Sequence, residues 1–332
     1  MLSRPVKKPA GGLIGGLFLC LSTSSIGMAN PATPFLVRDQ NPFALIYGLP
    51  HATAARLPED SHQGWIFSLN GSNQLIRHTS QDTELLVDLE TWQLNLFYDY
   101  RLKDNWLLRI QLPLISHGGG FMDAPIDRYH EITGLPRDIR PVFEDDLIQI
   151  RYSEDQNTLL EINQRQKGLG DIALQLGWQA DKSTEYALSH WLSLKLPSGD
   201  SEKLTGSGGT DIAAWSALDY RLSDASWFYG QAGLLYMNDS EVLQHRHNNW
   251  AVFATAGMAY QAWPDIQLKA QFDIHSALYD SELKYLSEVV QLTFGGSYRI
   301  NAQQSIDFAI AEDIQAGASP DVNFNISWWL YY

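Results

Sequence analysis

The sequence predicts an all-β fold, an antiparallel transmembrane β-barrel of about 12 strands with a long extracellular loop; roughly ten or fourteen strands are the alternatives. Three observations lead to this fold class. Apolar and polar side chains alternate in many segments of nine or more residues. The connections between these segments are short on one side and mostly long on the other. The chain also ends as a strand, because every second residue from Val322 to Tyr332 is large and apolar.

Residues 1–29 are predicted to be a secretory signal peptide. A cationic start precedes an apolar run over 12–21, and small residues precede a cleavage site before Asn30. The apolar run is about half of the roughly 20 residues that a membrane-spanning helix needs. Cys20, the single cysteine, lies in this run, so we expect neither disulfides nor thiolate metal sites in the mature chain.

The charge of the chain argues against nucleic acid as a partner. The full sequence has 23 basic and 38 acidic residues, a formal net charge of −15, and the signal peptide contains only basic ones. The hydrophobic content is 45%, yet no later stretch is continuously apolar over the length of a membrane span. A helical membrane protein is therefore not predicted, and the apolar residues must be distributed by alternation.

An extended lead over residues 30–60, periplasmic or luminal, precedes the predicted barrel at 61–332. We expect strands near 65–76, 85–100, 105–117, 169–180, 186–197, 211–222, 226–237, 249–262, 266–277, 287–300, 304–313 and 321–332. In the ninth segment, Ile266 and Leu268 begin an apolar face, while Gln267 and Lys269 begin a polar one. Such a strand offers one face to lipid and the other to water.

The connections distinguish a membrane barrel from a soluble β-sandwich, whose strands alternate in the same way. Those at 101–104, 223–225, 263–265 and 301–303 are short, whereas most connections after odd-numbered strands are longer and polar. Short turns at one end and long loops at the other are typical of outer-membrane barrels. Aromatic residues, 12% of the chain, often lie near strand ends, where amphipathic rings favour the head-group level. The even number of strands places both barrel ends in the periplasm.

Residues 118–168 are predicted to form an extracellular lid or plug loop. Gly118–Gly120 provides a flexible break, 124–132 a short helix with Asp123 as N-cap, and 147–164 a hairpin. A loop of about fifty residues is usually functional or disordered, and this one is long enough to enter the barrel mouth.

The C-terminal strand indicates the cell outer membrane as the location. A strand that ends on an aromatic residue resembles the sorting signal read by the barrel assembly machinery, although Tyr332 stands where such signals usually have phenylalanine. The expected partners are therefore that machinery during insertion, outer-membrane lipid and lipopolysaccharide, and a small solute whose identity the sequence does not give.

Four segments carry a resemblance to a known family. They are NPFALIYGLP at 41–50, HGGGFMDAPIDRYHEITGLP from His117, GLGD at 168–171 and LKLPSGD at 194–200. With them the mature chain, from about Pro34 to Tyr332, resembles an uncharacterised Gram-negative outer-membrane family catalogued as a domain of unknown function. The last two segments recur across several barrel families. The resemblance implies a barrel but no activity and no functional residues.

Lipid-modifying chemistry is one alternative, because the long loop contains residue types that a barrel enzyme would use. The candidates are His117, Ser116, Asp127, His130 and Glu131. A serine nucleophile needs an adjacent base that a third group orients. Ser116 and His117 are neighbours on a strand and so point to opposite faces, which argues against that pair. No spacing in this cluster is diagnostic, and we name no catalytic residue.

Metal binding is weaker still as an interpretation. Asp127, His130 and Glu131 would share one face of a helix, and His245 and His247 are close in sequence. The neighbouring cations Arg128 and Arg246 would repel a metal ion. We therefore expect no metal and no cofactor.

Conduction is the function that the sequence favours. Residues predicted to line the lumen have mixed charges, which pair across a narrow barrel or line a small polar path; the candidates are Asp99, Arg109, Lys195, Lys269, Asp273, His275 and Arg299. Candidates on the lid loop are His117, Asp127, Arg128, His130 and Glu131. Large side chains at Phe97, Trp191 and Trp215 would narrow the lumen further. The expected function is a selective passive channel for a small solute, apolar or amphipathic; a barrel enzyme and a non-conducting structural barrel remain alternatives.

Overall fold

The computed structural model describes residues 33–58, 62–80, 82–125, 128, 146–314, 317–320 and 322–332. The predicted signal peptide, residues 1–29, lies outside the described residues. Within them, no helix combines the length and the apolar character that crossing a bilayer requires.

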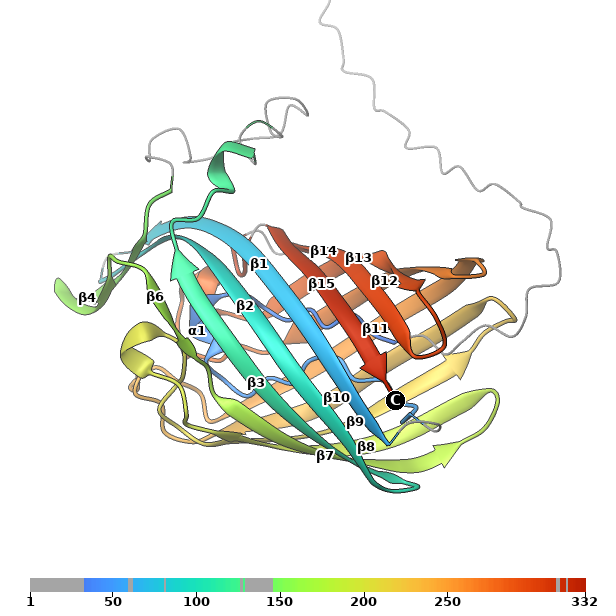
Figure 1. Ribbon diagram of the computed structural model, residues 1–332. Coiled ribbons are helices and arrows are strands. Elements are labelled where there is room, and N and C mark those ends of the chain that lie inside the picture. Colours follow the sequence, from blue (N-terminus) through green and yellow to red (C-terminus); the bar gives the residue numbers. More distant parts are fainter. Residues whose placement is uncertain are drawn as a thin grey trace, which may run out of the picture.

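The described strands close into an antiparallel barrel with twelve strand positions, which confirms the predicted fold class (Figure 1). In chain order the wall consists of β1 (Gln63–Thr79), β2 (Thr83–Lys103), β3 (Trp106–Gly118), β7 (Ile172–Lys182), β8 (Tyr186–Leu196), β9 (Asp211–Arg221), β10 (Ser226–Met237), β11 (Trp250–Trp263), β12 (Ile266–His275), β13 (Val289–Arg299), β14 (Gln304–Asp313) and β15 (Val322–Tyr331). The short strand β6 (Gln166–Leu169) shares the position of β7, since both pair with β3.

The last strand closes the barrel on the first. β15 pairs with β1 from Gly64 opposite Tyr331 to Asn73 opposite Val322. This pairing satisfies the backbone groups of both edges, which an open sheet in lipid would leave without hydrogen bonds at a cost of several kcal/mol each.

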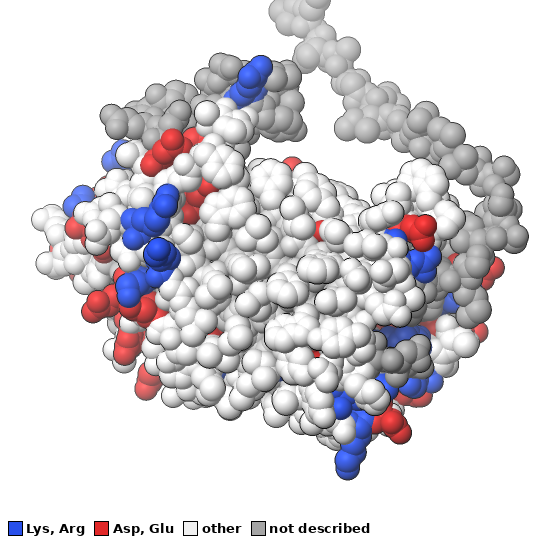
Figure 2. Space-filling view, viewed as in Figure 1, with Lys and Arg blue, Asp and Glu red and all other residues white. Residues whose placement is uncertain are grey.

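Side chains alternate between lumen and exterior as the sequence pattern predicts. On β12, the outward Leu268 is 49% exposed, whereas the inward Lys269 is 4% exposed. The same alternation on every wall strand gives the outer surface a broad uncharged belt, and charged residues gather at its two ends (Figure 2). The belt is the lipid-facing surface expected of a membrane barrel.

The two ends of the barrel differ in their connections. At the short-turn end, compact turns follow β2, β7, β9, β11 and β13, and this end also holds the start of β1 and the end of β15. At the opposite, long-loop end, β1 and β2 extend beyond their neighbours. The hairpin of β4 (Gln149–Glu154) and β5 (Asn157–Ile162), expected at 147–164, lies there and pairs with the extension of β2.

Residues 33–58, here called the inner segment, lie inside the barrel (Figure 1). The carbonyl of Thr33 accepts a hydrogen bond from Lys269, near the start of β12 at the short-turn end. The segment then runs to the long-loop end, forms the one-turn helix α1 (Pro42–Leu45) and returns. The amide of Leu57 donates to Gln179, near the short-turn end of β7. The sequence does not decide whether residues 30–60 lie in the periplasm or in the lumen. In the structure, residues 33–58 lie in the lumen.

The long-loop end is covered by an apolar cluster built on α1. Phe43 makes edge-to-face contacts with Tyr279 and Tyr285, each at 6.3 Å between ring centroids. The loops before β9, β11 and β13, with the 3-10 helices η2 (Ser201–Lys203) and η3 (Lys284–Leu286), complete the cover. They contribute buried Leu204, Val242, Leu243, Leu278, Leu283 and Leu286, next to Met237 at the end of β10. Each large apolar side chain buried in this way contributes about 1.5–3 kcal/mol.

The β4–β5 hairpin joins this cover through both apolar and ionic contacts. Ile150 and Tyr152 pack into the cluster. Glu154 accepts hydrogen bonds from Tyr152, from His245 at 2.8 Å and from Arg246 at 2.9 Å. Burial acts to raise the pKa of Glu154, but these three hydrogen bonds outweigh it and lower that pKa below its ordinary value. Glu154 is therefore ionised at neutral pH and fastens the hairpin to the loop before β11.

Candidate functional site

Wall glutamines hold the backbone of the inner segment in the lumen. The amide of Gln271 accepts from the Phe35 N–H at 2.9 Å and donates to the Phe35 carbonyl at 3.2 Å. Gln231 accepts from the Thr53 N–H at 3.0 Å and donates to the His51 carbonyl at 3.4 Å. Gln179 accepts from the Leu57 N–H at 2.9 Å and donates to the Ala55 carbonyl at 3.1 Å. Each primary amide thus takes the place of a neighbouring strand for a buried backbone that has none.

Cationic side chains satisfy further carbonyl groups of the inner segment. Lys195 donates to the Ile46 carbonyl at 3.0 Å. Arg38, inside the segment, donates to the carbonyls of Leu49 at 2.7 Å and Leu45 at 2.6 Å, which ties the two limbs together beside α1. Gly48 lies against the wall at the same level, where an added Cβ would come within 3.1 Å of the Cβ of Asp211. Glycine therefore allows this close approach.

The predicted lumen-lining charges face inward, and most are paired. Arg109 binds Asp99 through two hydrogen bonds of 2.6 and 2.8 Å. Lys269 contacts Asp307 at 3.1 Å. Other described lumen residues are paired as well: Lys195 contacts Asp171 at 2.6 Å and Asp211 at 3.1 Å, and Arg56 contacts Asp219 at 3.4 Å. The ring of His275 lies 3.4 Å from the Asp39 carboxylate. The charges thus bind one another and the inner segment instead of lining an open path.

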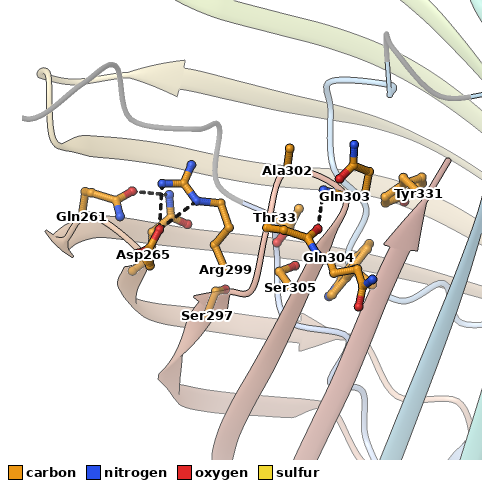
Figure 3. A pocket seen from close by; sticks show the side chains of 13 residues that line it. Thr33, Gln261, Asp265, Ser297, Arg299, Ala302, Gln303, Gln304, Ser305 and Tyr331 are labelled. Carbon is orange, nitrogen blue, oxygen red and sulfur yellow. Dashed lines mark hydrogen bonds and ion pairs between the residues drawn. The ribbon is translucent and has the colours of Figure 1, made fainter.

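Two further predicted residues have different surroundings. Asp273 accepts hydrogen bonds from Thr255 at 2.7 Å and Gln271 at 2.8 Å. Arg299 lies at the rim of the short-turn end and pairs with Asp265 at 3.2 Å. Together with Gln261, Gln303 and Tyr331, it lines a pocket with a volume of about 160 Å³ (Figure 3).

Large aromatic side chains narrow the lumen, as the sequence indicates. Trp191 and Trp215 stack with 5.9 Å between ring centroids, and the guanidinium of Arg109 lies 5.5 Å from the rings of both Trp191 and Phe97. A Cβ on Gly177 would meet the Trp191 ring at 2.7 Å, so the glycine makes room for the indole.

Two smaller cavities lie between the inner segment and the wall, and both are bordered by Arg38 and Leu49. Their volumes are about 30 and 20 Å³, which is space for one or two water molecules. A larger solute can pass these points only if the inner segment moves.

The lid-loop candidates are not gathered into one site by the described structure. His117 points into the lumen, where its ring contacts the Thr91 hydroxyl at 3.0 Å and the Leu204 carbonyl at 3.1 Å. Arg128 is exposed, and Asp127, His130 and Glu131 lie outside the described residues. The loop begins by folding over the outer face of β2, where Glu90 accepts from the amides of Phe121 and Met122.

The arrangement required for serine-type hydrolysis is not found among the described residues. Ser116 faces outward, away from His117. A second histidine–hydroxyl contact, His190 with Ser216 at 2.8 Å, also faces outward, and in the described part of the chain no carboxylate orients either ring. The described residues likewise contain no group of three or more potential metal ligands. His245, one of the metal candidates, instead pairs with Glu154.

Sequence reasoning missed the residues that hold the inner segment. Gln179, Gln231 and Gln271 occupy inward positions, but a water-filled lumen would have the same polar pattern. The one available signal was their type, since a primary amide both donates and accepts and so matches a backbone peptide group.

Comparisons with known proteins agree with the barrel. A family model described as a protein of unknown function (DUF3187) matches residues 13–330. A crystal structure titled the COG4313 outer membrane channel from Pseudomonas putida F1 is similar in fold, with 12% identity, coverage of 83% of this chain and 97% of that chain, and a TM-score of 0.54. The KdgM porin also matches, with 6% identity, coverage of 81% and 99%, and a TM-score of 0.44. A search of curated proteins finds no match.

Proposed function

Because the chain belongs to the DUF3187 family, whose description assigns no activity, we propose a function from its structure: a passive, selective outer-membrane channel for a small solute, closed by the inner segment. One observation carries this proposal. The lumen is filled by a segment that belongs to no strand of the wall and is held by side chains, so it can leave while the wall stays closed.

The outer surface and the topology support a location in the outer membrane. The uncharged belt fits a bilayer, and the short-turn end, with both ends of the barrel wall, faces the periplasm. The covered long-loop end then faces the exterior, among the phosphate groups of lipopolysaccharide. The barrel assembly machinery recognises the C-terminal strand during insertion.

The wall around the inner segment favours an uncharged, hydrogen-bonding solute. Many of its inward side chains are amides and hydroxyls, among them the buried Asn70, Gln93, Asn95, Gln111, Gln175, Gln291, Asn323 and Asn325. The charged side chains are mostly paired with one another and leave little field to select an ion. A polar or amphipathic small molecule fits this lining better than a purely apolar one.

A disulfide between the inner segment and the wall tests the proposal. Gly48→Cys and Asp211→Cys are suitable because their Cβ atoms would lie 3.1 Å apart, slightly closer than the roughly 3.5–4.5 Å of disulfides. The predicted mature chain has no other cysteine. In planar bilayers the oxidised double variant should be silent and should conduct after reduction, whereas the single variants Gly48→Cys and Asp211→Cys should not respond to oxidant.

A deletion of residues 33–58 provides the decisive second measurement. The deletion variant, checked for folding by its altered gel mobility before heating, should conduct continuously. If it folds but stays silent, the barrel is not a channel, and the structural-barrel alternative takes its place.

A further inference from the structure

His51 is a buried titratable residue of the inner segment whose ring nitrogens both lack a hydrogen-bond partner. Its side chain is 4% exposed, and neither Nδ1 nor Nε2 has a partner. The imidazole meets the Phe97 ring edge-to-face, with 5.5 Å between centroids and 87° between planes. An unpaired polar ring in this position weakens docking of the segment, so its presence calls for a functional explanation.

Two cations lie close to this ring. The guanidinium of Arg109 contacts the same Phe97 ring, and His51 is within electrostatic reach of both Arg109 and Arg38. The charge of Arg109 is already matched by Asp99. Arg38 donates to backbone carbonyls and lies within electrostatic range of Asp39, Asp171 and Asp211, whereas the charges that act on His51 are the two arginines. A proton on His51 would therefore add a third positive charge beside two guanidinium groups.

We propose that His51 is the pH-sensitive release point of the inner segment, whose protonation favours the undocked segment and opens the channel. This regulation rests on the proposed channel function. In the released segment the imidazole is in water and takes up a proton with an ordinary pKa of about 6.5. Release is thus coupled to uptake of one proton. Below pH of about 6.5 the docking equilibrium shifts toward release by about tenfold for each pH unit.

Other titratable groups beside the inner segment have different effects. His275 faces Asp39 at 3.4 Å, and a proton on His275 would strengthen that contact and hold the segment in place. Asp273 is bound by Thr255 and Gln271. Asp211 accepts from the Gly48 N–H at 2.8 Å and Asp219 pairs with Arg56 at 3.4 Å, so loss of either negative charge would also weaken docking. Of the two histidines His51 and His275, His51 is the one whose added proton has no acceptor and opposes docking.

The test compares bilayer conductance of the mature protein at pH 7.5 and 5.0. Wild-type open probability should rise at least about tenfold as the pH falls. His51→Phe keeps an aromatic ring against Phe97 but cannot titrate, and its open probability should change less than about twofold. His51→Arg carries a permanent charge and should conduct already at pH 7.5. His62→Gln, at an exposed position beside β1, is the matched control and should respond like wild type.

The outcomes separate this inference from the channel proposal. If the 33–58 deletion conducts but wild type does not respond to pH, or His51→Phe keeps the response, the inference is wrong and the channel proposal stands. Loss of the response in His275→Gln or Asp273→Asn with the response retained in His51→Phe would also overturn it. Hydrogen exchange of residues 33–58, corrected for intrinsic rates, gives a second readout: release at pH 5.0 should be seen in wild type but not in His51→Phe.

Discussion

Single buried charges in the lumen depend on their partners, and Asp307 is the clearest case. It accepts hydrogen bonds from Lys269, Ser297 and Trp329, and Lys269 also lies 4.1 Å from the Phe35 ring centroid. Asp307→Asn would keep the shape of the side chain but leave the Lys269 ammonium buried without a counter-charge. We expect a loss of about 3–5 kcal/mol in unfolding free energy, measured by urea titration in detergent.

A double variant serves as the control for this prediction. Lys269→Met with Asp307→Leu removes both charges, so it should recover most of the lost stability. If Asp307→Asn alone is as stable as wild type, water must reach Lys269 and the pair is not truly buried.

At the residue scale, the sequence predicts which side chains face inward but not all of their partners. The pairing of Asp99 with Arg109 follows from a two-residue turn that sets the register of β2 on β3. Lys269 and Asp307, by contrast, lie on strands separated by β13, so their contact depends on two registers and on barrel curvature. The orphaned His51 has no sequence signal at all, because a lone histidine in an extended segment is usually in water.

At the scale of elements, the inner segment depends on the wall amides, and Gln271→Leu tests this dependence. The substitution leaves the N–H and C=O of Phe35 without partners in the lumen. Each unpaired group costs about 1–3 kcal/mol, enough to shift the segment toward release. Hydrogen exchange over residues 33–39 should accelerate at least about tenfold, because 1.4 kcal/mol corresponds to that factor.

Thr293→Val is the matched control for Gln271→Leu. Thr293 is also inward and fully buried, but its hydroxyl has no hydrogen-bond partner. Exchange in the inner segment should therefore be unchanged. Equal acceleration in both variants would show that any loss of polarity in the lumen, not the loss of the glutamine contact, releases the segment.

The position of the inner segment was beyond prediction for a physical reason. A membrane strand is recognised by its period of two, because one of its faces meets lipid and the other the lumen. Residues 34–47 are instead buried without interruption and show no such alternation. Many hydrogen bonds of residues 33–58 go to strands far away in the chain, among them β7, β8, β10 and β12. The β4–β5 hairpin, which pairs locally, was in contrast correctly expected from its own residues.

At the scale of the whole molecule, stability in the membrane depends on the uncharged belt. Leu192, 52% exposed at the middle of β8, faces lipid, and Leu192→Arg should cost about 2–4 kcal/mol of folding free energy in vesicles. Leu196→Arg, at the long-loop end of the same strand, should cost about 0–1 kcal/mol. If both substitutions reduced the folding free energy equally, the middle of β8 would not lie deeper in the bilayer than its end.

The barrel itself was predictable because lipid and water impose one rule on every wall strand. Each of the twelve expected segments overlaps one strand position of the wall, and the short and long connections fall at opposite ends. The observed strand bounds differ most from the expected ones in β1 and β2, which continue beyond the belt. Outside the bilayer, lipid no longer requires apolar side chains on the outer face, so the alternation is weaker there.

The course of the inner segment also bears on how the barrel can assemble. The segment precedes β1 in the chain, whereas the seam of the barrel is formed by β15 pairing with β1. Since the segment enters and leaves the lumen through the same opening, sealing the seam cannot thread or trap it. The topology therefore allows the wall to close before the lumen is filled.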